Sequence, residues 1–145
     1  MYRQILLCYD GTAEGRRALR QGADVAMAMK SRAYLLAICH NLLSTAVPEG
    51  ITPELVRCEQ QTADQLLNEG VQWLRDHGVP ADGQLVHGNP LVHIPEVAAR
   101  IGADLIVVGH RYRNRITRWW AEEEEITLLH KINCSILVAM AEPAA

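Results

Sequence analysis

The chain has 145 residues, of which 49% are apolar and 21% charged, so it can bury the core of one ordinary domain and lacks the composition of a disordered protein. A formal charge of −3, from 14 Lys and Arg against 17 Asp and Glu, excludes the strong positive field that drives non-specific nucleic-acid binding. No apolar run reaches the roughly 18 residues of a membrane span, and we expect a cytoplasmic protein without a signal peptide.

The first half of the chain alternates between an apolar run and a segment of helical period. Ile5–Tyr9 is a continuous apolar run, typical of a strand that is buried on both faces. Asp10-Gly11-Thr12 ends this run and offers its threonine as a helix N-cap. The apolar spacing then predicts one helix from Ala13 to about Met29. A second strand is predicted at Tyr34–Cys39, followed by a long loop from His40 to Ile51.

The second half continues the alternation. Thr52-Pro53 opens a helix with proline at its first position, and the segment His77–Pro80 stops it. A short third strand is predicted at Gln84–Val86. The turn Gly88-Asn89-Pro90 leads into a third helix. Asp104–Gly109 is the clearest buried strand in the sequence.

After the strand 104–109 an irregular basic stretch precedes a last helix near Glu122–Ile132 and a last strand at Ser135–Ala139. Strands that alternate with helices and read as solid apolar runs predict an α/β fold: one doubly wound, Rossmann-like domain over residues 1–145, with a parallel sheet covered on both faces. In such sheets ligands bind beyond the carboxyl ends of the strands. The segments to consider are therefore Asp10-Gly11, Cys39-His40 and the residues that follow Gly109.

Four segments carry a resemblance to a known family. They are Ile5–Thr12, an opening strand with an Asp-Gly-Thr turn; Val86–Pro90, a strand followed by a Gly-x-Pro turn; Ala103–Gly109; and Asn133–Val138. In this order and spacing they resemble the universal stress proteins over essentially the whole chain. The resemblance implies a five-stranded parallel sheet of order 3-2-1-4-5, the adenine nucleotide hydrolase-like fold. It also implies a homodimer that pairs through the last strand, here Ile136, Leu137, Val138 and Ala139.

Nucleotide-binding members of that family carry the pattern G-x2-G-x9-G-[ST] after strand four, in which glycines and a helix N-terminus receive the phosphates. Here Gly109 takes the first position, but Tyr112, Glu122 and Glu123 take the other three. Two like charges about 4 Å apart repel by roughly 4 kcal/mol at an effective dielectric near 20, whereas a helix N-terminus contributes only about 0.3–1 kcal/mol per charge. The sequence therefore predicts that the family's ATP site is degenerate and that Glu122–Glu125 satisfy the helix end themselves.

The arginines before these glutamates leave three interpretations open. Arg111, Arg113, Arg115 and Arg118 balance the four glutamates, so the segment is either a solvated loop of ion pairs or a loop whose arginines hold an anionic ligand in place of the glycines. A third interpretation is a single-stranded nucleic-acid patch formed with Tyr112. The net negative charge of the chain and the adjacent glutamates argue against it.

If a nucleotide such as ATP or AMP does bind, the resemblance directs it to the cleft after strands one and four. Asp10 matches an acidic residue close to the ligand in nucleotide-binding members, although an aspartate in a tight turn also caps backbone N–H groups. His40 is a polar residue near the position of the small apolar residue beside adenine. The residues of this alternative site are Asp10, Gly11, Ile38, His40, Val108, Gly109, Arg111, Tyr112, Arg113, Glu122 and Glu123.

Neither a metal site nor a catalytic site is indicated. His87, His93 and His110 lie near the same rim but without ligand spacing, and the four cysteines, Cys8, Cys39, Cys58 and Cys134, show no CxxC pattern. The sequence contains no nucleophile elbow, P-loop or G-x-G-x-x-G motif. We therefore expect a non-enzymatic domain that needs no cofactor and acts through protein partners, and the family resemblance implies that it has a role in the stress response. The alternative is an ATP-, AMP- or anion-binding module.

Overall fold

The computed structural model describes residues 1–39, 53–110 and 122–140. Their centre is a parallel sheet of five strands in the order β3-β2-β1-β4-β5. The strands are β1 (Gln4–Tyr9), β2 (Arg32–Cys39), β3 (Ala81–His87), β4 (Leu105–His110) and β5 (Ser135–Met140). The predicted fold class and the strand order implied by the family resemblance are both confirmed.

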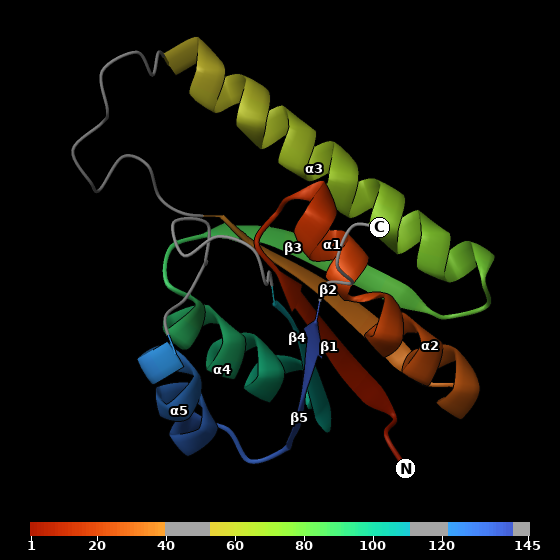
Figure 1. Cartoon of the computed structure of the whole chain (residues 1–145). Helices are drawn as coiled ribbons and strands as arrows, with labels where there is room; N and C mark the ends of the chain where they lie inside the picture. Colours follow the sequence, from red (N-terminus) through yellow and green to blue (C-terminus); the bar gives the residue numbers. More distant parts are fainter. Residues whose placement is uncertain (40–52, 111–121, 141–145) are drawn as a thin grey trace.

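Helices cover both faces of this sheet (Figure 1). On one face lie α1 (Ala13–Ala18), α2 (Arg20–Met29) and α3 (Pro53–Asp76); on the other lie α4 (Pro90–Ile101) and α5 (Glu122–Lys131). Alternate residues of each strand supply the two cores. In β1, Ile5, Leu7 and Tyr9 pack toward the first three helices, whereas Leu6 and Cys8 pack toward the other two. Solid apolar runs in β1 and β4 thus have the structural cause that the sequence indicated.

The predicted helix from Ala13 to Met29 is wrong in one respect, because it is divided at Leu19 into α1 and α2. The N–H of Leu19 donates to the carbonyl of Arg16 at 3.1 Å, which tightens the chain to a three-residue turn. The break lies between two close approaches to the sheet. A Cβ atom on Gly22 would lie 2.7 Å from Leu7 and 2.8 Å from Val107, and one on Gly109 would lie 3.3 Å from Ala18. Apolar spacing cannot encode such approaches.

The third strand is longer than the predicted segment Gln84–Val86, since it begins at Ala81. Its register pairs Ala81 with Ala33 of β2 and continues to the end of that strand. Gly83 pairs with Leu35 in this register. A side chain would not fit at this position, because a Cβ atom would lie 2.8 Å from the carbonyl oxygen of Leu35. Asp82 and Gly83 look like turn residues in the sequence, but here backbone pairing and close packing place them in a strand.

Capping follows the sequence signals where the structure describes them. The hydroxyl of Thr12 caps α1, the side chain of Asn89 caps α4 with Pro90 at its first position, and Pro53 opens α3. The predicted loop 40–51, the cap at Thr52 and the arginine-rich stretch 111–118 lie outside the described residues. No helix in the described ranges is long and apolar enough to cross a bilayer.

Candidate functional site

The Asp10 carboxylate is held in the turn after β1. Its Oδ1 accepts hydrogen bonds from the N–H of Thr12 at 3.0 Å and from the Thr12 hydroxyl at 2.5 Å. The same hydroxyl accepts from the N–H of Gly15 at 3.1 Å, which completes the N-cap of α1. Asp10 therefore organises the helix start, as the capping interpretation of this residue requires.

Three glycines bring the candidate residues of β1, β2 and β4 close together. Gly11 has φ +82°, and a Cβ atom there would lie 2.7 Å from the sulfur of Cys39. A Cβ atom on Gly15 would collide with the Asp10 carboxylate, and one on Gly109 would lie 3.0 Å from the carbonyl oxygen of Gly15. The carboxyl ends of β1 and β4 are thus packed against the first turn of α1.

Two apolar residues of the alternative nucleotide site are core residues. Ile38 is 2% exposed and Val108 is not exposed, and both pack in the core beneath α4 and α5. Gly109 is also buried. The structure therefore brings Asp10, Gly11 and Gly109 together at the carboxyl ends of the strands. Ile38 and Val108 lie in the core next to them.

The remaining residues of that site are only partly covered by the structure. His40, Arg111, Tyr112 and Arg113 lie outside the described residues. Glu122 and Glu123 are placed as backbone only: α5 begins at Glu122, so the four successive glutamates form its first turn. This confirms the predicted helix start, and negative side chains in a first turn are favourable for a helix.

The histidines near the carboxyl ends of the strands form no metal site among the residues that the structure describes. Nε2 of His93 lies 2.9 Å from the backbone carbonyl oxygen of His87, which is an exposed residue. The side chain of His110 lies outside the described residues. No group of three or more His, Cys, Asp or Glu residues in the described ranges has the geometry to hold a metal ion.

A buried phenol lies next to Asp10, and sequence reasoning missed it. Tyr9 has no exposed surface, and among the described residues its hydroxyl has no hydrogen-bond partner. Burial raises the pKa of Tyr9 well above its ordinary value, against the opposing effect of the nearby Arg16 guanidinium. The only sequence signal is that Tyr9 is the one hydroxyl-bearing residue in an otherwise apolar strand.

The cysteine of the same strand is similarly enclosed. Cys8 is buried, Cys39 and Cys134 are half-buried, and none of the three forms a disulfide among the described residues. Burial, with a smaller contribution from Cys134, raises the pKa of the Cys8 thiol above its ordinary value. A thiol held protonated in this way is a weak nucleophile, so Cys8 has the properties of a core residue.

Comparison with known proteins agrees with this fold. The chain is 25% identical over 141 residues to the "Stress response protein NhaX" of Bacillus subtilis, covering 79% of this chain and 84% of that one. It is similar in structure to a universal stress protein family member from Burkholderia pseudomallei, with TM-score 0.68 and 22% identity over 94% of this chain and 95% of that chain.

A second similar solved structure is a complex with a nucleotide. It is the universal stress protein from Archaeoglobus fulgidus in complex with dAMP, with TM-score 0.61 and 19% identity over 94% of this chain and 97% of that chain. Likeness at these identities shows the shared fold. The model of the universal stress protein family matches residues 1–139, which is nearly the whole sequence. The chain therefore belongs to the universal stress protein family.

Proposed function

We propose that this protein is a non-enzymatic stress-response domain that acts through protein contacts and has lost the nucleoside triphosphate site of its family. The observation that carries the proposal is the start of α5 at Glu122, which makes Glu122–Glu125 its first turn. In the family pattern a glycine and a serine or threonine stand at the first two of these positions. This protein places negative charge where a phosphate would meet the helix N-terminus.

Electrostatics favours loss of the site. A helix N-terminus attracts an anion by about 0.3–1 kcal/mol, whereas each carboxylate within about 4 Å of a phosphate opposes it by roughly 4 kcal/mol at a dielectric near 20. Carboxylates at that distance would therefore outweigh the attraction of the helix end.

The alternative function is an anion-binding module at the same edge. Gly109 retains the first glycine of the pattern, and it lies against the start of α1 beside Asp10. The relative from Archaeoglobus fulgidus is described in complex with dAMP, a ligand with one phosphate. In this alternative the Gly109 backbone with Arg111 or Arg113 would hold AMP or another small anion, and ATP would bind weakly.

Titration calorimetry with Mg-ATP and with AMP separates the two functions, after extraction shows that the purified protein carries no nucleotide. We expect no binding of either ligand at millimolar concentration. Saturable AMP binding that weakens with added salt and with Arg113→Ala would establish the alternative instead. Tight Mg-ATP binding would overturn both the loss of the site and the role assigned to the glutamates.

A gain-of-function variant tests the same proposal through the appearance of ATP binding. Tyr112→Gly with Glu122→Gly and Glu123→Ser restores the family pattern, and we expect it to bind Mg-ATP where the parent does not. The matched control, Asp64→Asn with Asp76→Asn, removes two negative charges at exposed positions of α3, which covers the opposite face of the sheet from α5. Equal ATP binding by the control would mean that net charge, rather than the pattern, determines affinity.

We also infer that the protein forms a homodimer through β5. Among the described residues, this strand is at the edge of the sheet, and β4 is its one neighbour. Its Val138 is 39% exposed, Ile136 and Leu137 are half-buried, and Ala139 is buried, so Ala139 would contribute through its backbone. An uncovered apolar edge strand pairs readily with another chain.

A further inference from the structure

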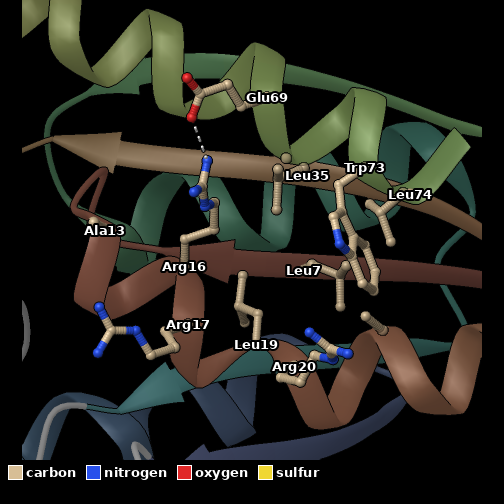
Figure 2. A pocket seen from close by; sticks show the side chains of 12 residues that line it. Leu7, Ala13, Arg16, Arg17, Leu19, Arg20, Leu35, Glu69, Trp73 and Leu74 are labelled. Atoms are coloured by element: carbon tan, nitrogen blue, oxygen red, sulfur yellow. Dashed lines mark hydrogen bonds and ion pairs between the residues drawn. The ribbon is translucent and has the colours of Figure 1, made fainter. Parts of the chain in front are cut away.

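A pocket of about 480 Å³ lies between α1–α2 and α3, above β1 and β2. Figure 2 shows side chains from both walls and from the strands beneath meeting around it. Its lining shares no residue with the candidate site at the carboxyl ends of the strands. All the lining residues are within the described ranges.

Two arginines connect the walls, and each joins the α1–α2 segment to α3. Nη1 of Arg16 donates to the backbone carbonyl of Leu66 at 2.7 Å and to Glu69 at 3.3 Å. One helical turn further along both walls, the guanidinium of Arg20 lies 4.7 Å from the centre of the Trp73 ring. Figure 2 shows Arg16 rising to Glu69 and the Trp73 ring reaching from α3 toward Arg20.

The floor of the pocket is apolar. Leu7 of β1 and Leu35 of β2 form it, with Leu19, Ala23 and Leu74 at its sides. All five are at most 5% exposed. Gly70 lets the α3 wall approach this floor closely, because a Cβ atom there would lie 2.7 Å from Leu35 and 3.3 Å from Arg16. A ligand here would place an apolar body on these side chains.

The rim carries the opposite sign of charge from the whole protein. Three arginines, Arg16, Arg17 and Arg20, line the pocket against the single carboxylate of Glu69, which gives the lining a formal charge of +2, whereas the whole chain carries −3. Arg17 is exposed, and Arg20 has a weak partner in Asp24 at 3.7 Å. Guanidinium groups bind carboxylates through two parallel N–H bonds, which suits an acidic ligand.

We propose that this pocket binds a small aromatic carboxylate. The ligand's carboxylate would meet Arg20 at the rim, and its ring would lie on Leu7 and Leu35 beside Trp73. Arg17, whose side chain extends away from Arg20 in Figure 2, would add longer-range attraction for the carboxylate. An aromatic body gains an edge-to-face contact with the indole ring beyond simple burial, which an aliphatic chain does not gain. The pocket volume is within the range of about 300–1,000 Å³ typical of small-molecule sites.

The test uses the full chain, with 2-naphthoate as the probe, in titration calorimetry and ligand-observed NMR. We expect saturable binding, and we expect neutral 2-naphthylmethanol and flexible decanoate to bind at least about tenfold more weakly, a difference of about 1.4 kcal/mol. No binding of 2-naphthoate at millimolar concentration would overturn the proposal. Equal binding of the alcohol would contradict the role assigned to the arginines. Equal binding of decanoate would contradict the preference for an aromatic ring.

Variants locate the site. Arg17→Gln with Arg20→Gln should weaken 2-naphthoate at least about tenfold, and Ala23→Leu should do so by filling the pocket without a change of charge. Arg16 is kept, because it holds α3. The control, Arg3→Gln with Arg32→Gln, removes two exposed arginines outside the lining and should leave affinity unchanged. Thermal unfolding checks that each variant is folded, and unchanged affinity in both folded pocket variants would place the ligand elsewhere.

Discussion

The carboxylate of Asp10 and the side chain of Thr12 form one hydrogen-bonded unit at the start of α1. Oδ1 of Asp10 accepts from both the backbone N–H and the hydroxyl of Thr12, and this hydroxyl in turn accepts from the N–H of Gly15. The acidic residue that the family resemblance associates with a ligand is therefore part of a helix cap. Any ligand at this edge of the sheet meets a carboxylate whose position the cap already determines.

Removal of the cap hydroxyl should destabilise the protein. We expect Thr12→Ala to lower the free energy of unfolding by about 1 kcal/mol, the usual cost of an N-cap threonine. Urea denaturation at neutral pH measures the change. Thr12→Ser keeps the hydroxyl and should lose much less. Equal losses in the two variants would mean that the threonine methyl group, rather than the cap, stabilises this turn.

Gly109 should tolerate no side chain, because the neighbours of a Cβ atom there include backbone. The carbonyl oxygen of Gly15 would lie 3.0 Å away and Ala18 3.3 Å away. We expect Gly109→Ala to cost about 1–3 kcal/mol of stability through overpacking, measured by urea denaturation. Gly70→Ala is the comparison, since its Cβ atom would meet the flexible end of Leu35 and alanine favours a helix interior by about 1 kcal/mol. A loss at Gly70 as large as at Gly109 would contradict this distinction.

Much of the fold could be predicted because it depends on local apolar patterns. The run Leu105–Val108 is buried on both faces, and this alone indicates a central parallel strand. The division at Leu19 could not be predicted, because the apolar spacing continues across it while packing of Gly22 against Val107 acts from distant sequence. The start of β3 at Ala81 depends in the same way on pairing with Ala33.

The candidate site was predictable only in part, for the same reason. Asp10 follows β1 and Gly109 lies near the end of β4, and these two strands are neighbours in the sheet, so topology alone places the two residues together. The pocket between Arg16 and Glu69 had no sequence signal, since the two residues are 53 positions apart and meet only after α1 and α3 pack on one face. The isolation of the Tyr9 hydroxyl is likewise a property of the packed core and not of the strand pattern.

The buried hydroxyl of Tyr9 should lower stability. A buried polar group without a partner costs about 1–3 kcal/mol, and the Tyr9 hydroxyl has none among the described residues. We expect Tyr9→Phe to raise the free energy of unfolding by about 1 kcal/mol in urea. Tyr34→Phe is the contrast, since its hydroxyl donates to Gln84 at 2.7 Å and its removal should destabilise. A loss in Tyr9→Phe would mean that a residue outside the described ranges accepts this hydrogen bond.

Alkaline pH should lower the free energy of unfolding through ionisation of Tyr9. Burial holds the pKa of Tyr9 above its ordinary value of 10.0, so the folded protein keeps a proton that the unfolded chain has released. Stability should therefore be constant with respect to Tyr9 below about pH 10 and fall above it, by up to about 1.4 kcal/mol per pH unit for one proton. Urea midpoints between pH 8 and 11.5 measure the slope. Tyr9→Phe should remove this part of the slope, and an unchanged slope would contradict the assignment.

The last prediction follows from the exposed position of β5 at the edge of the sheet. We expect sedimentation velocity at micromolar concentration to give twice the chain mass of 16.1 kDa. We expect Val138→Glu to weaken the dimer at least about tenfold, because a carboxylate in an apolar interface loses its hydration without a partner. Val92→Glu is the matched control, since Val92 is a 56% exposed valine on α4 rather than on the edge strand. A wild-type monomer would exclude the dimer, and a dimer weakened only by Val92→Glu would move the interface to α4. If Val138→Glu alone gives a monomer, the apolar edge strand is the surface through which two copies of the chain associate.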